Sequence, residues 1–475
     1  MAEVRFLLSC LLAWLTGNSP HTPSIHILDD DSLLNIFCLY RPAVFDGDED
    51  TGLQMSGGKK WDRERWWYQP THVCQRWRNL ILRSASFLNL CLVCTFGTPI
   101  ADMLAHSLPL PLIIDYNDTD RSIAAEVEDE IILALEQRER IQRIRLLLPA
   151  PNIQRFITVI EGEYPILEYF IMGTPDNNNN SAGLMLTETF QAPHLRHLVL
   201  DDIGIPIRSR LITTAVGLVT LVLIMVHPST YFHPNTLLQW ISFTPQLEIL
   251  VINFLFPVPN RDVERHLMRM RTAVTTHVTL PNLFWLTLQG GSAYIEAVVR
   301  HITTPRLEKL EIGFHNQLTF SIPCLLQFIN TTENLRFSRA TFLFSNEKVG
   351  VEVYPHEEAK IHAFYIEVDC GHLDWQVSSV AQIFNALGQN SSAVEHLTFE
   401  HRVHSRSFEE HNDVDRTEWR KLLRSFSNVK TLNVNDKLVG EFSRCLRLDD
   451  GELPLEVLPE LQELMLSGTV DDPFT

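Results

Sequence analysis

A six-residue phrase with apolar residues at its first, fourth and sixth positions recurs along most of this chain. The second half of the phrase alternates apolar and variable residues, which is the period of a β-strand. A phrase that returns at intervals indicates a repeat architecture, in which each unit buries its apolar face against the next. Clear copies span residues 195–200, 247–252, 283–288, 307–312, 394–399, 429–434 and 461–466, and weaker copies span residues 141–146, 167–172 and 218–223.

The spacing of the phrases indicates the kind of repeat. Their starts at residues 141, 167, 195, 218, 247, 283 and 307 are irregularly spaced. The intervals are close to the roughly 20 to 29 residues of regular leucine-rich repeats and in one case, from 247 to 283, longer. Candidate helices lie between phrases, at residues 123–139, 262–274, 293–302, 323–330, 374–387, 417–426 and 438–446. We therefore predict that residues 86–475 form an irregular, leucine-rich-repeat-like α/β solenoid with a parallel inner sheet and outer helices.

Alternation along each strand separates a core face from a concave face. Leu198 and Leu200 are expected in the core, and their neighbours at the concave surface. Most concave positions in a repeat protein are simply solvated, but an apolar group with an aromatic anchor is typical of a partner-binding centre. The predicted target-binding residues are His197, Val199, Ile249, Val251, Trp285, Thr287, Lys309 and Glu311.

One stretch interrupts the array. Residues 339–368 are rich in β-forming residues and lack the spacing of the other repeats. Two interpretations are open: a meander inserted into the solenoid, or one long irregular repeat.

The start of the chain carries a split helical pattern. Residues 27–37 place Leu33 and Phe37 one turn apart behind three aspartates, whose charge favours a helix N-terminus. Residues 71–81 place Val73, Trp77 and Leu80 on one face, and Cys74 and Ile81 widen that face. Residues 41–65 have no apolar period, which predicts an exposed, disordered loop within one helical domain over residues 25–85. An ordinary helical hairpin that caps a larger domain is the alternative.

This split pattern resembles an F-box, although Asp29 stands where F-boxes usually have proline. The resemblance implies that the helices dock on the Skp-type adaptor of an SCF ubiquitin ligase and, through it, on a cullin. The residues implied in adaptor binding are Leu28, Leu33, Leu34, Ile36, Phe37, Val73, Cys74, Trp77, Leu80 and Ile81.

Further phrases are similar to the large F-box protein family of mushroom-forming fungi. They lie at residues 90–95, 98–100, 108–114, 373–379 and 419–434, so the resemblance runs from about Ile25 almost to the end of the sequence. It implies a substrate-recognition subunit without enzymatic activity of its own, in which the repeat domain holds an unknown target protein. Such a subunit needs no cofactor, and we expect it in the cytoplasm or nucleus.

Charge limits the partners. The chain has 58 acidic and 39 basic residues and a net charge of −19. This excess of negative charge argues against electrostatic attachment to nucleic acid or to an anionic membrane, and it favours partners with basic surfaces.

The sequence carries no pattern of an active site or a metal site. Gly57-Gly58-Lys59-Lys60 lacks the spacing of a phosphate loop, and there is no G-x-S-x-G or H-E-x-x-H. The eight cysteines are scattered in mostly apolar runs, as reduced packing cysteines are. Cys91 and Cys94 have metal-like spacing, but they sit in a strand-like run without a second pair, so core packing is the better interpretation.

An apolar extension over residues 1–24 leaves a second function open. Its run at residues 6–15 follows Arg5 and could be the core of a secretory signal, although no small-residue cleavage site follows. The alternative function is therefore a secreted or surface leucine-rich-repeat binding protein. A packing helix and an alternative-start extension are the other interpretations of this segment.

Overall fold

The fold is taken from a computed structural model, which describes residues 28–42, 64–118, 123–174, 183–254, 277–315, 317, 319–402, 416–446 and 457–467. The extension over residues 1–24, most of the predicted loop and the predicted helix at 262–274 lie outside these residues. The chain divides into two compact units, Met1–Asn177 and Asn178–Thr475. The division predicted after residue 85 therefore falls inside the first unit.

The described residues of the first unit start with the helices α2 (Asp30–Tyr40), α4 (Tyr68–Thr71) and α5 (Gln75–Arg83). Asp29 caps α2, because its carboxylate accepts a hydrogen bond from the Ser32 amide at 2.7 Å. Arg76 of α5 donates to the Asp30 carboxylate at 2.7 Å and to the Leu28 carbonyl at 2.6 Å. The predicted acidic helix start is thus confirmed, and the same segment is tied to α5.

The rest of the first unit alternates strands and helices. Its four strands run parallel in the order β1, β2, β3, β4. The elements in chain order are β1 (Leu92–Cys94), α6 (Ile100–His106), β2 (Leu112–Asn117), α7 (Ala125–Leu135), the short 3₁₀ helix Arg138–Arg140, β3 (Ile141–Leu147), α8 (Ala150–Val159) and β4 (Tyr169–Gly173). The helix predicted at 123–139 is α7.

The described residues of the second unit contribute eleven strands to one sheet. In spatial order they are β6 (His197–Asp201), β8 (Thr220–Val226), β9 (Ile249–Phe254), β11 (Trp285–Gly290), β13 (Lys309–His315), β16 (Phe364–Asp369), β15 (Lys348–Tyr354), β14 (Arg339–Phe344), β17 (His396–His401), β18 (Thr431–Asn435) and β19 (Glu463–Ser467). Two further parallel pairs are β5 (Leu184–Met185) with β7 (Ile203–Gly204), and β10 (Val278–Thr279) with β12 (Ile302–Thr303).

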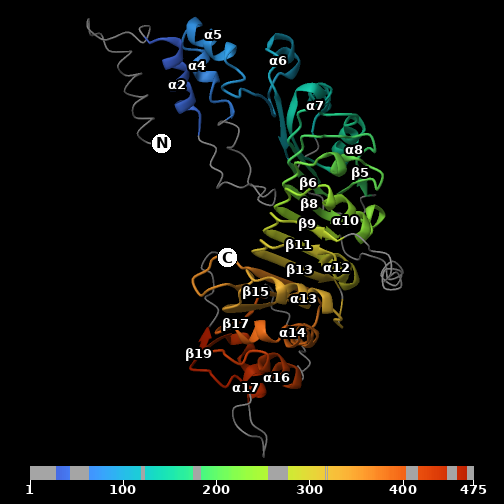
Figure 1. The fold of residues 1–475 in the computed structure, drawn as a ribbon, viewed down its shortest axis with the longest axis vertical. Helices are drawn as coiled ribbons and strands as arrows, with labels where there is room; N and C mark the ends of the chain where they lie inside the picture. The colour runs from blue at the N-terminus through green and yellow to red at the C-terminus, as the bar shows by residue number, and fades with distance from the viewer. Residues whose placement is uncertain are drawn as a thin grey trace, which may run out of the picture. The chain divides into compact units, whose positions relative to one another are not determined.

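Helices follow most of these strands. They are α9 (Leu211–Thr214), α10 (Pro234–Ser242), α12 (Ser292–Val299), α13 (Pro323–Thr331), α14 (Leu373–Leu387), α15 (Gln389–Ser392), α16 (Arg416–Arg424) and α17 (Val439–Leu446), with short 3₁₀ helices at Pro228–Thr230 and Asp436–Leu438. Figure 1 shows α10, α12, α13 and α14 along one side of the strands of this unit. The helices predicted at 293–302, 323–330, 374–387, 417–426 and 438–446 are confirmed.

Every recurring phrase forms a strand of the predicted kind. The strand starts at or near the third residue of its phrase in nine of the ten copies, as in β6, β9 and β11, whereas β3 starts at the first. The closing apolar residues of a phrase, such as Leu198 and Leu200, are buried in every copy except the last, where Leu464 and Leu466 of β19 are exposed. The α/β class and the large, mostly parallel sheet are therefore confirmed.

The β-rich stretch is a meander. Strand β14 follows α13 in the chain but does not pair with β13; the antiparallel partners β15 and β16 lie between them. Parallel pairing resumes between β14 and β17. Strand β15 is thus antiparallel to both of its neighbours, and the hairpin β15–β16 is an insertion into the parallel order.

Candidate interaction surfaces

The helical segment closes a small core of its own. Leu33 and Phe37 of α2 and Trp77 and Ile81 of α5 are buried, and the rings of Phe37 and Trp77 meet edge to face with centroids 5.1 Å apart. These four residues were implied in adaptor docking by the resemblance. The structure buries their side chains within the first unit, and their role in adaptor docking stays a prediction.

Other apolar side chains remain at the surface of this segment. Val73 is 48% exposed, and two residues that the sequence reasoning missed, Leu39 and Phe87, are 72% and 63% exposed. The remaining expected residues, Leu28, Leu34, Ile36, Cys74 and Leu80, are half-buried. A signal for Leu39 was available, because a leucine at that position of α2 lies off the buried face of the helix.

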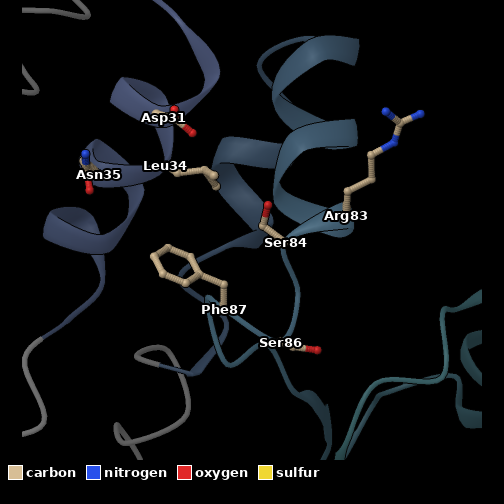
Figure 2. Close-up of a pocket in the computed structure, with 7 residues that line it drawn as sticks. All are labelled: Asp31, Leu34, Asn35, Arg83, Ser84, Ser86 and Phe87. Carbon is tan, nitrogen blue, oxygen red and sulfur yellow. The ribbon is translucent and has the colours of Figure 1, made fainter.

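An open hollow of about 630 Å³ lies between α2 and the end of α5. Figure 2 shows Leu34 of α2 pointing toward Ser84, with the ring of Phe87 below it. The other lining residues are Asp31, Asn35, Arg83 and Ser86. The hollow therefore has an apolar centre between Leu34 and Phe87 and a polar rim.

The residues just before α4 anchor the helices to the sheet of the first unit. The Trp67 indole N–H donates to the Cys91 carbonyl at 3.3 Å. The Arg65 guanidinium donates to the Thr95 hydroxyl at 2.8 Å and to the Val93 carbonyl at 3.3 Å. The predicted exposed loop therefore ends before Arg65, which is half-buried and bonded to strand β1.

Cys94 ends strand β1 and Cys91 directly precedes it, and both are unbridged, buried thiols. Burial raises the pKa of Cys91 to about 11 and that of Cys94 to about 12, so both thiols are protonated at neutral pH. Over the described ranges, no group of three or more His, Cys, Asp or Glu side chains is arranged to hold a metal ion.

The predicted apolar patch on the second unit is not exposed. Val199, Ile249, Val251, Trp285 and Thr287 are all buried. They lie on the face of the sheet that carries the side chains alternating with the core leucines, which we call the helix-distal face. Alternation predicted their direction correctly, but in-register parallel strands place Val199, Val222, Val251 and Thr287 side by side, where they pack on one another.

The exposed part of the helix-distal face is polar and begins at β13. Lys309 lies 3.6 Å from the centre of the Trp285 ring, and its Nζ is 2.8 Å from Glu311 Oε1. The Trp285 indole donates to the Thr287 hydroxyl at 3.0 Å, and that hydroxyl donates to Glu311 Oε2 at 2.8 Å. Lys309 and Glu311 are half-buried, as is His197, whose Nδ1 lies 3.1 Å from the Thr220 hydroxyl.

Glu311 is held in its charged form. Burial alone would raise the pKa of its carboxyl group, but hydrogen bonds from His362 and Lys309 and the charge of Lys309 lower it to about 2. His362 Nε2 lies 3.0 Å from Glu311 Oε1. Glu311 lies on β13, and its carboxylate contacts Thr287 of β11 and His362, which lies two residues before β16.

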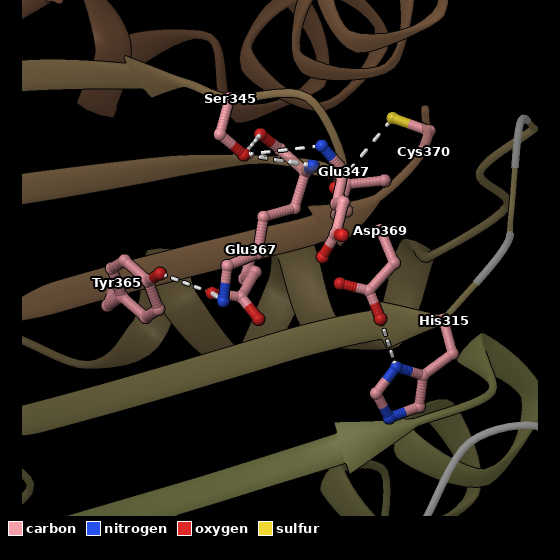
Figure 3. A network of polar contacts seen from close by, with 9 residues as sticks. His315, Ser345, Glu347, Tyr365, Glu367, Asp369 and Cys370 are labelled. Atoms are coloured by element: carbon pink, nitrogen blue, oxygen red, sulfur yellow. Dashed lines mark hydrogen bonds and ion pairs between the residues drawn. The ribbon is translucent and has the colours of Figure 1, made fainter. Parts of the chain in front are cut away.

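The polar contacts continue across the inserted hairpin. The Tyr365 hydroxyl donates to Glu367 at 2.6 Å, and Lys348 Nζ lies 2.9 Å from the same carboxylate. Figure 3 shows this bond and the neighbouring pair of His315 and Asp369 at the ends of their strands. The Tyr365 ring lies across Gly350, where an added Cβ would come within 2.8 Å of the hydroxyl.

Strand β14 contributes a cation that stacks on a ring of β15. The Arg339 guanidinium lies 4.0 Å from the centre of the Tyr354 ring and donates to the carbonyls of Glu357 and Ala359. Burial, followed by the hydrogen bond to Glu352, raises the pKa of Tyr354 to about 12. The surface from β13 to β17 thus offers charged and hydrogen-bonding groups held in fixed positions.

Comparison with known proteins yields little. No family model matches the chain, and no curated protein matches it. Among solved structures, the leucine-rich repeat-containing protein LegL7 from Legionella pneumophila aligns over 69% of this chain and 91% of its own length, with 10% identity and a TM-score of 0.25. A likeness at that score adds nothing to the fold described above. Within the described ranges, no helix is both long and apolar enough to cross a membrane.

Proposed function

We propose that this chain is a non-enzymatic substrate-recognition subunit of an SCF-type ubiquitin ligase. In this proposal the helical segment docks on a Skp-type adaptor, and a leucine-rich-repeat-like scaffold in the second unit binds a target protein. The resemblance of residues 27–37 and 71–81 to an F-box motivates the adaptor. One structural observation carries the proposal: the α2–α5 pair fills its own core and still leaves Leu34, Leu39, Val73 and Phe87 at its surface.

This division changes which residues test the docking. Loss of Phe37 or Trp77 would remove buried aromatic packing, which typically costs about 3–5 kcal/mol, and would unfold the segment whether or not an adaptor exists. Leu39 and Phe87 are largely exposed, so their replacement leaves the core intact.

Titration calorimetry of the full chain with a purified Skp-type adaptor tests the first part of the proposal, the docking of the helical segment on the adaptor. We expect one adaptor per chain and a loss of at least about tenfold in affinity for Leu39→Asp combined with Phe87→Asp, because interface anchors carry most binding energy. The matched control is Ile207→Asp with Ile361→Asp, which adds the same two charges at apolar residues of the second unit that are 64% and 71% exposed. The wild-type chain failing to bind, or the control losing as much as the double variant, would refute the docking.

The second part of the proposal, target binding, is based on the polar surface between β13 and β17. Glu352 and Glu367 lie on neighbouring strands of the inserted hairpin, at the same face as Glu311. Quantitative proximity labelling in cells should therefore separate two sets of partners. Glu352→Lys with Glu367→Lys should lose the target and keep the adaptor, whereas Leu39→Asp with Phe87→Asp should do the reverse. Identical losses in both variants would contradict two separate surfaces.

A further inference from the structure

The last strand in the order of the second sheet has an exposed apolar surface. Leu464, Met465 and Leu466 of β19 are 51%, 43% and 61% exposed. Their partners on β18 show how unusual this is: Leu432 pairs in register with Leu464 and Val434 with Leu466, and both β18 residues are buried. The apolar row that forms the core elsewhere thus continues into solvent at β19.

Only one side of the β19 backbone is hydrogen-bonded to another strand among the described residues. The Glu463 amide donates to the Lys430 carbonyl at 3.0 Å, which fixes which residues face β18. Because backbone groups alternate in direction along a strand, the N–H and C=O groups of Leu464 and Leu466 point away from β18. No strand among the described residues pairs with that side.

Strand edges of this kind are normally protected. Natural sheets use proline, lysine, a bulge or an inward-pointing charge to prevent edge pairing. Residues 463–467 read Glu-Leu-Met-Leu-Ser and contain none of these in the middle of the strand. Pairing of β19 with β18 is in register over all five residues. The edge is therefore apolar, regular in its pairing with β18, and without a second neighbouring strand among the described residues.

The sequence of this strand is complementary to itself. An antiparallel second copy centred on Met465 would place Leu464 opposite Leu466, and Glu463 opposite Ser467, so no like charges would meet. The residues with outward backbone groups, Leu464 and Leu466, are also the ones that would exchange hydrogen bonds. A register centred on Leu464 would instead leave Leu466 without an apolar partner.

We propose that two copies of this chain associate edge to edge through antiparallel pairing of β19, with the twofold axis at Met465. A closed twofold contact uses the same patch on both copies, which the symmetric pattern of this strand permits. A five-residue edge is smaller than the roughly 800 Å² per partner of a standard interface, so the dimer is weak, with a dissociation constant on the order of micromolar.

Sedimentation velocity of the full chain from about 1 to about 100 µM tests this proposal. The wild type should show a reversible monomer–dimer equilibrium. Leu464→Lys with Leu466→Lys should be monomeric, because each copy then places a lysine opposite a lysine. Leu464→Lys with Leu466→Glu should dimerise again, since each new lysine faces a new glutamate of the other copy, and salt should weaken that dimer. Unchanged circular dichroism and melting temperature would confirm that the variants are folded.

Two results would overturn the proposal. One is a wild type that stays monomeric over the whole range, which would leave the edge to a different partner. The other is a lysine–glutamate variant as monomeric as the double-lysine variant, which would exclude the antiparallel register. Neither result depends on the adaptor, because the experiment contains only this chain.

Discussion

The helix-distal face of the second unit has two halves that differ in chemistry. The recurring phrase forms every strand of the first half, whereas in the second half it forms β13 and β17, which flank the three strands of the meander. On β6, β8, β9 and β11 the central row is Val199, Val222, Val251 and Thr287, and all four are buried. On β13, β16, β15, β14 and β17 the same row is Glu311, Tyr365, Glu352, Thr341 and Thr398, and all five are half-buried. The phrase determines the core positions and leaves the alternate positions free, so one half uses them for packing and the other for polar contacts.

The change occurs between β11 and β13. Trp285 and Thr287 end the packed half, and their register partners Lys309 and Glu311 begin the polar half. The inserted hairpin then supplies two of the polar strands. This arrangement argues that a partner would meet the second half of the face and not the apolar group expected from the sequence.

The difference between the two halves is tested most strongly by introducing one charged side chain into each half and comparing the loss of stability. Val251→Asp should lower the free energy of unfolding by more than about 3 kcal/mol, because the carboxylate would be buried without a partner. Thr398→Asp should cost less than about 1 kcal/mol at a half-buried polar site. Urea unfolding followed by circular dichroism measures both. Equal losses would show that the two halves do not differ as described.

The second prediction concerns acid. The pKa of Glu311 is about 2 in the folded chain, against an ordinary value of 4.5. Because the folded state binds this proton less readily, the charged carboxylate stabilises the fold above about pH 4.5, and that stabilisation is lost as the pH falls toward 2.

Replacing Glu311 with glutamine isolates this group. At pH 7 the free energy of unfolding of the wild type should exceed that of Glu311→Gln by up to about 3 kcal/mol. This difference in stability should vanish near pH 2. Unfolding free energies of both proteins over this pH range give the difference curve. A difference that does not depend on pH would mean that the network around Glu311 is not electrostatic.

The smallest expected effect concerns the close approach of Tyr365 to Gly350. Gly350→Ala should cost about 1–2 kcal/mol, because the new methyl group must displace a tyrosine whose hydroxyl is bonded to Glu367. Gly217→Ala is the control, since nothing lies within 4 Å of its Cβ position, and it should change stability by less than about 1 kcal/mol. Melting temperatures of the two variants give the comparison, and a neutral Gly350→Ala would show that the tyrosine is not held.

The strands were predictable because the alternation of apolar and variable residues that favours a strand lies within each phrase. The closing residues of a phrase, such as Leu286 and Leu288, alternate with polar or variable ones, and their burial depends only on the next unit being similar. The order of β14, β15 and β16 was not predictable in this way. It depends on which distant strand β14 pairs with, and the residues of 339–368 do not specify that pairing.

The solvent exposure of a side chain was harder to predict than the face of the sheet or helix on which it lies. The sequence places Val251 on the correct face, but whether a side chain on that face is buried depends on the residues at the same level of the neighbouring strands. The helical segment teaches the same lesson. Its pattern identifies Phe37 and Trp77 as one apolar face but does not say that they pack on each other and leave Leu39 and Phe87 exposed.

Hydrogen–deuterium exchange of the full chain with and without a purified Skp-type adaptor tests the central claim most directly. The account predicts slower exchange in α2, α5 and the residues around Phe87 when the adaptor is present. Exchange in β13, β14, β15, β16 and β17 should be unchanged, because that surface is reserved for the target. No protection in the helical segment at saturating adaptor, or protection confined to the sheet of the second unit, would contradict it.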